Sequence, residues 1–269
     1  MVGIAGARSM TASAWQTVSE NGYVCLSGLL APLDLERLRD ELACAIERCR
    51  VVQVENNITQ RTEQTAHHIP QADNGFVALL GHFSEWGVVD LLQQMLGGPV
   101  ILNSFGGLNN LNSTNAYVRN VHRDVRSWSS ESMQMAQVLV LLDDFTADNG
   151  ATLFLSGSHL SPDKPANAQF DTHASKALGK AGSLYIFDSR IWHAAGINTT
   201  SGPRRCLTLT FTRSNLKPQF DYCRALGEEF CLAQSTQIQQ LLGWYARTPS
   251  TLHEWYQPEE QRFYRKTQG

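Results

Sequence analysis

The second half of the chain contains short stretches in which hydrophobic side chains recur at every second position. The clearest is Arg204–Arg213, which alternates strictly. Its apolar face comprises Leu207, Leu209 and Phe211, and its polar face comprises Arg204, Cys206, Thr208, Thr210 and Thr212. Successive side chains of a strand point to opposite faces of a sheet. This pattern predicts a strand whose apolar face packs against other elements and whose polar face looks into a wet or ligand-filled interior.

Six more strands are expected around this one. They are predicted at residues 100–105, 116–124, 133–142, 152–155, 183–187 and 192–195. Gly, Asn, Ser and Pro separate these stretches, and such spacing is typical of a β-sandwich or barrel.

Helical periodicity appears on both sides of the predicted strands. After a strand at 23–26, helices are expected at 32–48 and 83–96, and the aromatic tail is helical again around 238–244. The polar segment 51–75 reads as a loop or lid bordering a pocket. We therefore expect a mainly β fold with flanking helices and one domain over 1–269. In it, a helical part (1–98) packs on a β core (99–214), and a helical cover (215–269) closes one end.

Composition narrows the class of partner. The 269 residues are 42% hydrophobic and 17% charged, with a net charge of −3 and no basic block, which argues against nucleic acid as a partner. The longest aliphatic run, 138–142, is too short to span a bilayer, and residues 1–10 lack the apolar core of a signal peptide. Six scattered cysteines without a C-x-x-C pair indicate free thiols. We therefore expect a cytoplasmic protein without a membrane partner; nothing defines its oligomeric state.

His122 and Asp124 form the most informative polar pair. On the strand predicted at 116–124 they would point the same way, about 7 Å apart along the backbone. An imidazole and a carboxylate at that spacing suit a divalent metal. A second histidine would complete the facial triad of two His and one carboxylate that leaves positions open in non-haem iron oxygenases.

Three residues are candidates for the third ligand: His159 beyond a strand, His173 in a polar loop and His193 in an apolar β segment. Spacing alone does not choose between a ligand and a buried, hydrogen-bonded role for His193. Eleven positions later, Arg204 begins the polar face described above. An arginine there can bind a carboxylate through two parallel hydrogen bonds.

Together these motifs resemble the phytanoyl-CoA dioxygenase family. The resemblance rests on the order of five segments: residues 122–124 (H-R-D), 142–152, 157–159 (G-S-H), 192–198 and Arg204. Residues 21–42 and 241–245 resemble the opening and closing elements of that family. The resemblance implies a double-stranded β-helix (jelly-roll, cupin-like) core and an oxygenase that depends on Fe(II), 2-oxoglutarate and O₂.

The resemblance also implies roles for particular residues. The metal ligands fall on His122, Asp124 and His193, and the 2-oxoglutarate arginine falls on Arg204. Thr152 matches a position that helps hold the cosubstrate, Asn103 and Asn120 are weaker candidates, and the Gly-Ser-His motif reads as a structural turn. Related halogenases replace the carboxylate ligand by Gly or Ala, so the presence of Asp124 disfavours halogenation. Turnover would release succinate and CO₂.

The sequence says less about the substrate than about the metal ligands and the cosubstrate. Arg126 and Trp128, just after the metal pair, are candidate substrate contacts. We favour hydroxylation of a specialised metabolite or an amino-acid-like compound; desaturation, epoxidation and ring formation remain open. Two alternatives differ in class: a jelly-roll hydrolase or isomerase, which would not need Arg204, and a binding module without catalysis.

Overall fold

The computed structural model describes residues 4–59, 62–73, 75–112, 117–125 and 127–268. Its helices are α1 (Ile4–Asn21), α2 (Pro32–Glu55), α3 (Phe76–His82), α4 (Val88–Leu96), α5 (Asn167–His173), α6 (Tyr222–Leu226), α7 (Glu228–Leu232), α8 (Thr236–Leu242) and α9 (Leu252–Trp255). Its strands are β1 (Tyr23–Leu26), β2 (Thr65–His67), β3 (Val100–Asn110), β4 (Met135–Leu141), β5 (Thr152–Phe154), β6 (Ser175–Lys176), β7 (Leu184–Asp188), β8 (His193–Ala195) and β9 (Arg204–Arg213). No described helix combines the length and the apolar character needed to cross a membrane.

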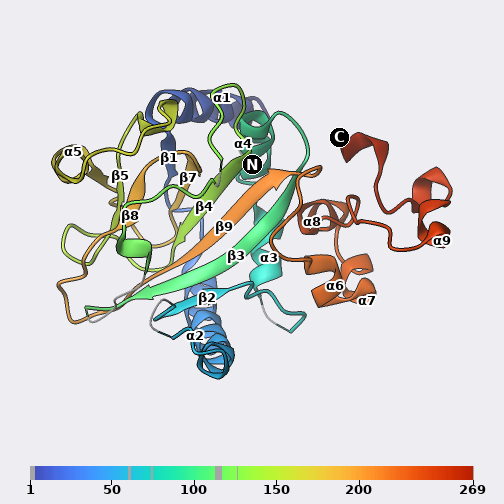
Figure 1. Cartoon of the computed structure of the whole chain (residues 1–269), viewed down its shortest axis with the longest axis horizontal. Coiled ribbons are helices and arrows are strands. Elements are labelled where there is room, and N and C mark those ends of the chain that lie inside the picture. The colour runs from blue at the N-terminus through green and yellow to red at the C-terminus, as the bar shows by residue number, and fades with distance from the viewer. Residues whose placement is uncertain (1–3, 60–61, 74, 113–116, 126, 269) are drawn as a thin grey trace.

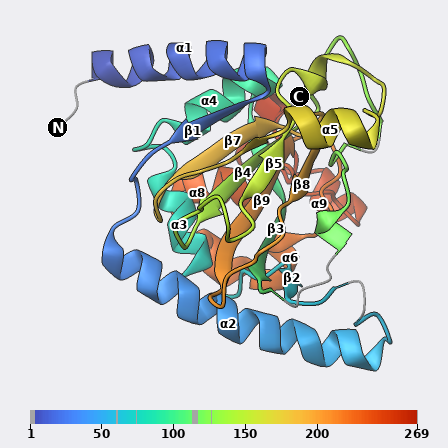
Figure 2. The same ribbon diagram turned by 90° about the vertical axis from the view of Figure 1, so that its left-hand side faces the viewer.

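The strands form two antiparallel sheets that face each other. The major sheet has the order β1-β7-β4-β9-β3-β2, and the minor sheet has the order β6-β5-β8 (Figure 1). Helices flank them: the long helices α1 and α2 lie on opposite sides of the strands in Figure 2, and the short helices α6–α9 lie beyond the β3 side of the major sheet in Figure 1. The fold is therefore the expected jelly-roll with flanking helices.

The two faces of the major sheet have different surroundings. On β9, Leu207, Leu209 and Phe211 are buried in one apolar cluster with residues from α1–α4 and α8. The alternate residues Cys206, Thr208 and Thr210 line a cavity between the sheets. The alternation predicted for this strand, and its bounds, are confirmed.

Three predicted elements differ from the structure. The helix expected at 83–96 begins only at Val88, as α4, because Gly87 adopts a left-handed conformation (φ +70°) just before it; a separate helix, α3, ends at His82. The helix expected to end at 48 continues to Glu55. The segment 51–75 is not only a loop: it contributes β2, which pairs with β3 at the edge of the major sheet.

The strand expected at 116–124 is also wrong. Tyr117–Arg119 forms a 3₁₀ turn, and of the described residues 117–124 only His122 makes a β-type pair. That pair is with His193, and the two residues exchange both backbone hydrogen bonds at 2.9 and 3.0 Å. The tertiary contact with β8, rather than a regular strand, therefore places His122 beside His193.

Gly150 occupies a turn that no larger residue fits. Its φ is +78°, and an added Cβ would lie 2.6 Å from the Gly196 carbonyl oxygen and against the Asn110 side chain, which donates to Gly150 and Gly196. We expect Gly150→Ala to lower the free energy of unfolding by roughly 2–4 kcal/mol, from left-handed strain plus overpacking. Urea unfolding measures this. Gly202→Ala is the matched control, because no heavy atom lies within 4 Å of its Cβ position and its φ lies outside the left-handed region; equal losses would contradict the prediction.

Candidate metal centre

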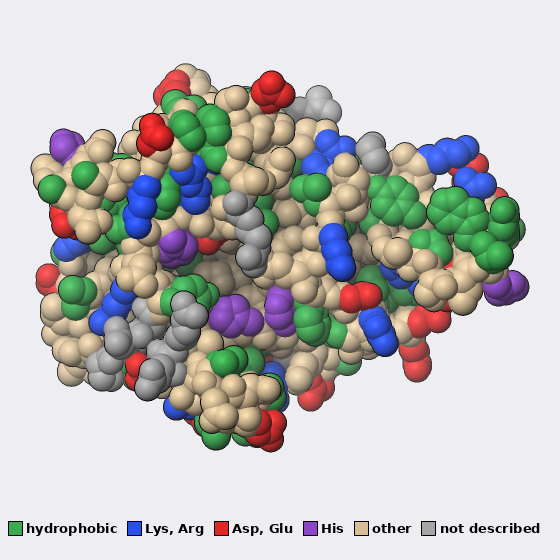
Figure 3. Space-filling model, viewed as in Figure 1, with side chains coloured by type: hydrophobic (Ala, Val, Ile, Leu, Met, Phe, Trp, Pro, Cys, Tyr) green, Lys and Arg blue, Asp and Glu red, His purple; other side chains and the backbone are tan. Residues whose placement is uncertain are grey.

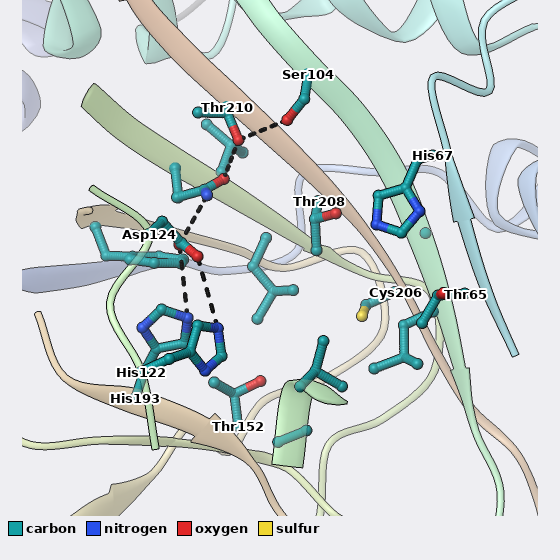
Figure 4. Close-up of a pocket in the computed structure, with 18 of the residues that line it drawn as sticks. Thr65, His67, Ser104, His122, Asp124, Thr152, His193, Cys206, Thr208 and Thr210 are labelled. Atoms are coloured by element: carbon teal, nitrogen blue, oxygen red, sulfur yellow. Dashed lines mark hydrogen bonds and ion pairs between the residues drawn. The ribbon is translucent and has the colours of Figure 1, made fainter. Parts of the chain in front are cut away.

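His122, Asp124 and His193 converge at one end of the cavity between the sheets. One ligand atom from each residue lies within 4.8 Å of the others. Among the described residues, this is the group of three or more His, Cys, Asp or Glu side chains that could hold a metal ion. The Asp124 carboxylate oxygens Oδ1 and Oδ2 lie 3.6 Å from His122 Nε2 and His193 Nε2, respectively (Figure 4). His159 and His173 are not part of the group.

The backbone orients both imidazoles toward this group. The Nδ1 atom of His122 lies 2.7 Å from the Asn120 carbonyl oxygen, and that of His193 lies 3.0 Å from the Ile191 carbonyl oxygen. A carbonyl oxygen only accepts, so each Nδ1 donates and each Nε2 keeps its lone pair. Such a contact on the far nitrogen fixes the tautomer and orientation of a metal-binding histidine.

Electrostatics favour the metal-binding form of His193. Its side chain is buried, and loss of solvation lowers its pKa below the ordinary value of 6.5, against an opposing effect of Asp124. A metal ligand must be neutral imidazole, so the lowered pKa keeps His193 ready for a cation. The three residues, two nitrogen donors and one carboxylate opening on a cavity, fit a divalent transition metal.

The cavity has a volume of about 320 Å³ and opens to the surface of the protein. Figure 3 shows histidine side chains gathered round a hollow on this face. Polar lining residues beyond the triad are Thr65, His67, Ser104, Tyr117, Gln137, Thr152, Arg204, Thr208, Thr210 and Gln219. The cavity therefore holds a metal-ligand group at one end and a wall of mostly uncharged polar groups elsewhere.

Arg204 lines the same cavity, although its side chain is fully buried. Its Nη1 donates to Cys206 Sγ at 3.2 Å, and its guanidinium lies over the Phe145 ring at 4.5 Å. Its Nε and Nη2 have no hydrogen-bond partner in the described part of the chain. Burial lowers the pKa of Arg204 from its usual value, yet a guanidinium remains charged in proteins. The site therefore contains a buried cation with an unsatisfied edge.

The remaining predicted site residues have different positions. Thr152, buried on β5, lines the cavity. Asn103 and Asn120 do not line it: Asn103 is buried at a bulge in β3, and Asn120 is exposed and contributes its backbone oxygen to His122. Trp128 donates to the His159 carbonyl oxygen and is not among the lining residues. Arg126 lies outside the described residues.

Several lining residues were missed by the sequence analysis. His67 and Thr65 reach the cavity from β2, and Tyr117 reaches it from the 3₁₀ turn. His67 Nε2 and the Tyr117 hydroxyl lie 3.2 Å apart, in hydrogen-bonding contact. Gln137, on β4, lies directly beside the metal ligands and donates to Asp124.

The Gly-Ser-His motif makes the structural turn expected of it. Ser158 Oγ accepts from the Trp192 amide, and His159 Nε2 donates to the Ser19 carbonyl oxygen at the end of α1. His159 is buried, and its Nδ1 has no partner in the described part of the chain. Burial lowers the pKa of His159, so the folded protein favours the neutral ring.

His159 should make stability depend on pH. Since its folded pKa is lowered from 6.5, the unfolded chain takes up the proton first, and the free energy of unfolding should fall as the pH drops below that value. His159→Gln, which keeps a donor for Ser19, should flatten this dependence in urea unfolding above and below pH 6.5. An unchanged slope for His159→Gln would contradict this role.

Comparison with known proteins identifies the family. The family model for phytanoyl-CoA dioxygenase (PhyH) matches residues 18–206. An uncharacterised protein of Mycobacterium tuberculosis is 44% identical over 148 residues, which cover 55% of this chain and 54% of that protein. The chain thus spans about half the length of this relative. A dioxygenase of Aspergillus terreus, trt7, is 23% identical over 85% of this chain and 82% of its own.

Solved structures share the fold. EctD from S. alaskensis, in its apo form, is 20% identical with a TM-score of 0.60, covering 77% of this chain and 80% of that one. The non-haem 2-oxoglutarate-dependent epimerase SnoN of nogalamycin biosynthesis is 17% identical with a TM-score of 0.57, covering 79% and 87%. Because the family model matches well over half of the sequence, the chain belongs to the phytanoyl-CoA dioxygenase family, whose members depend on Fe(II) and 2-oxoglutarate.

Proposed function

We propose that this protein is a non-haem Fe(II)- and 2-oxoglutarate-dependent dioxygenase that hydroxylates a small organic molecule, a specialised metabolite or an amino-acid-like compound, and releases succinate and CO₂. One observation carries the proposal. The buried Arg204 guanidinium lines the same cavity as the His122–Asp124–His193 group and has an unpaired edge. A metal site alone would not need this cation, which matches a cosubstrate that bears a second carboxylate.

The free edge of Arg204 has the right chemistry for a carboxylate. Nε and Nη2 donate side by side, in the geometry that a carboxylate accepts through two oxygens. The same edge of Arg205 binds the Asp143 carboxylate in this protein, at 2.9 Å for both contacts. Arg205 uses that edge for an internal acid, whereas Arg204 keeps it for a ligand.

The triad would hold iron through His122 Nε2, His193 Nε2 and one oxygen of Asp124. Bound iron would supply the activation of O₂ that couples decarboxylation of 2-oxoglutarate to oxidation of the substrate. Arg204, held by Cys206 and Phe145, would bind the far carboxylate of the cosubstrate, and the Thr152 hydroxyl would lie beside it. These residues thus bind and orient the cosubstrate.

The substrate would bind against a part of the cavity wall that lies outside the minor sheet. That wall includes Thr65 and His67 from β2, Tyr117 and Gln219. Burial lowers the pKa of His67, which favours its neutral ring. Hydroxyl, amide and imidazole groups of this kind suit a small polar molecule, which supports a substrate of modest size without net charge at this wall. Hydroxylation is the outcome that we propose for a substrate bound there.

An anaerobic titration tests the proposed function. Addition of Fe(II) and then 2-oxoglutarate to the metal-free protein should produce the weak visible charge-transfer band of the iron–cosubstrate chelate. His193→Ala should lose the band through loss of iron, and Arg204→Ala should lose it at cosubstrate concentrations that saturate the unaltered protein. A folded protein that binds metal tightly but gives no band would point to a jelly-roll hydrolase or isomerase instead. A folded protein that binds neither would be a binding module.

A further inference from the structure

A line of hydrogen bonds crosses three neighbouring strands and ends on Asp124. Ser104 on β3 donates to Thr210 on β9 at 2.9 Å, and Thr210 donates to the Gln137 amide oxygen on β4 at 2.9 Å. The Gln137 amide nitrogen donates to Asp124 Oδ2 at 2.8 Å. Figure 4 shows this line running from Ser104 to the metal group. The β core is therefore coupled directly to a metal ligand.

The chemistry of each group fixes the direction of the line. The Asp124 carboxylate only accepts, so Gln137 must present its NH₂ to it and its carbonyl oxygen to Thr210. The single hydroxyl hydrogen of Thr210 is used on that oxygen, so Thr210 accepts from Ser104. Thr210 is directly opposite both partners in the sheet register. Gln137 and Thr210 are only 8% and 5% exposed, so water does not replace these contacts readily.

The triad by itself does not determine which oxygen of Asp124 binds a metal. Each carboxylate oxygen lies at the same distance, 3.6 Å, from one of the two imidazole nitrogens. Gln137 breaks this equivalence because it donates only to Oδ2. A facial triad leaves room for cosubstrate and dioxygen only while the carboxylate takes one coordination position.

We propose that Gln137 is a positioning residue that holds Asp124 Oδ2 away from the metal and leaves Oδ1 as the single metal-binding oxygen. This inference rests on the proposed function. Thr210 and Ser104 act through Gln137 by keeping its amide from turning over. Without the line, the carboxylate would be free to rotate, so neither oxygen would be held in place for a metal and the site would bind it more weakly.

Iron affinity, measured without turnover, tests the role of Gln137. Competition for Fe(II) with a chromophoric chelator under anaerobic conditions should show Gln137→Leu binding about 10–100-fold more weakly, the usual effect of losing a partner of a metal ligand. Thr210→Val should also weaken Fe(II) binding, whereas Thr210→Ser, which keeps the hydroxyl, should bind Fe(II) as the unaltered protein does. Thr212→Val is the matched control: it makes the same change on the same face of β9, at a buried residue outside both the line and the cavity lining. Its Fe(II) affinity should equal that of the unaltered protein.

A spectroscopic signature separates positioning from general structural damage. With Fe(II) and 2-oxoglutarate bound, Gln137→Leu and Thr210→Val should shift the charge-transfer band, because Asp124 is no longer held in one position; Thr212→Val should not. If the unaltered protein gives the band and Gln137→Leu has the same Fe(II) affinity and the same band, the positioning role of Gln137 is wrong, whereas the proposed function stands. Absence of the band from the unaltered protein would instead reject the proposed function. If Gln137→Leu does not fold, the comparison of Thr210→Val with Thr210→Ser decides.

Discussion

Asp124→Ala is expected to abolish tight Fe(II) binding and, with it, formation of succinate from 2-oxoglutarate. Asp124 is the single anionic member of the triad and the residue that both imidazole nitrogens approach to 3.6 Å. Loss of a charged partner in a partly buried cluster costs roughly 4 kcal/mol, on the order of 10³-fold in affinity. Equilibrium dialysis of Fe(II) under argon and succinate release in air measure the two effects.

Two comparisons make the Asp124 result specific. Asp171→Ala removes an exposed carboxylate from α5, far along the chain, and should leave Fe(II) binding unchanged. Asp124→Glu keeps the charge but lengthens the side chain past the Gln137 donor, so it should bind iron more weakly than the unaltered protein and more tightly than Asp124→Ala. Full iron affinity in Asp124→Ala would exclude this residue as a ligand.

Arg204→Lys is expected to raise the KM for 2-oxoglutarate by roughly 10²–10⁴-fold, because two charge-assisted hydrogen bonds worth about 1.5–3 kcal/mol each are lost. Lysine keeps the charge but cannot present two parallel donors, and it lacks the planar group that packs on Phe145. Succinate formation at increasing cosubstrate concentration measures the change. Fe(II) affinity should stay close to normal, since Arg204 is not a metal ligand.

Arg205→Lys is the matched control for Arg204→Lys. It makes the same change one residue further along β9, at an arginine whose guanidinium group is already paired with Asp143 through Nε and Nη2. Its KM for 2-oxoglutarate should be that of the unaltered protein. A normal KM in Arg204→Lys would contradict the assignment of the cosubstrate carboxylate to this residue. A large rise in both variants would point to distortion of the strand instead.

Regular alternation made the β core predictable from sequence. The face of β9 that carries Arg204, Cys206, Thr208 and Thr210 was assigned to the interior, and that assignment is confirmed because period-two patterns are local to one strand. The convergence of His122 with Asp124 was also anticipated, but on a wrong premise. Their alignment comes from the pairing of His122 with His193, a contact between residues 71 positions apart, rather than from a strand.

The errors arose where tertiary contacts or a single backbone conformation outweighed the local pattern. A three-residue strand such as β2 has too few positions to show periodicity, so the wall that it adds to the cavity was invisible. Gly87 lies within a convincing apolar stripe, but its left-handed backbone delays the start of the helix to Val88. Gln137 did leave a signal: it is the polar exception in the buried run Ala136–Leu142, and a buried amide needs a partner.

The unpaired edge of Arg204 would make the stability of the fold depend on the concentration of 2-oxoglutarate. A buried guanidinium edge that has no hydrogen-bond partner among the described residues costs the folded state energy, and a dicarboxylate that pairs with it would return that energy only while it is bound. By mass action, cosubstrate at about 100 times its dissociation constant would add roughly 2.7 kcal/mol to the stability of the fold. Cells short of 2-oxoglutarate would then hold less of the folded protein as well as a slower enzyme, so abundance and activity would decline together.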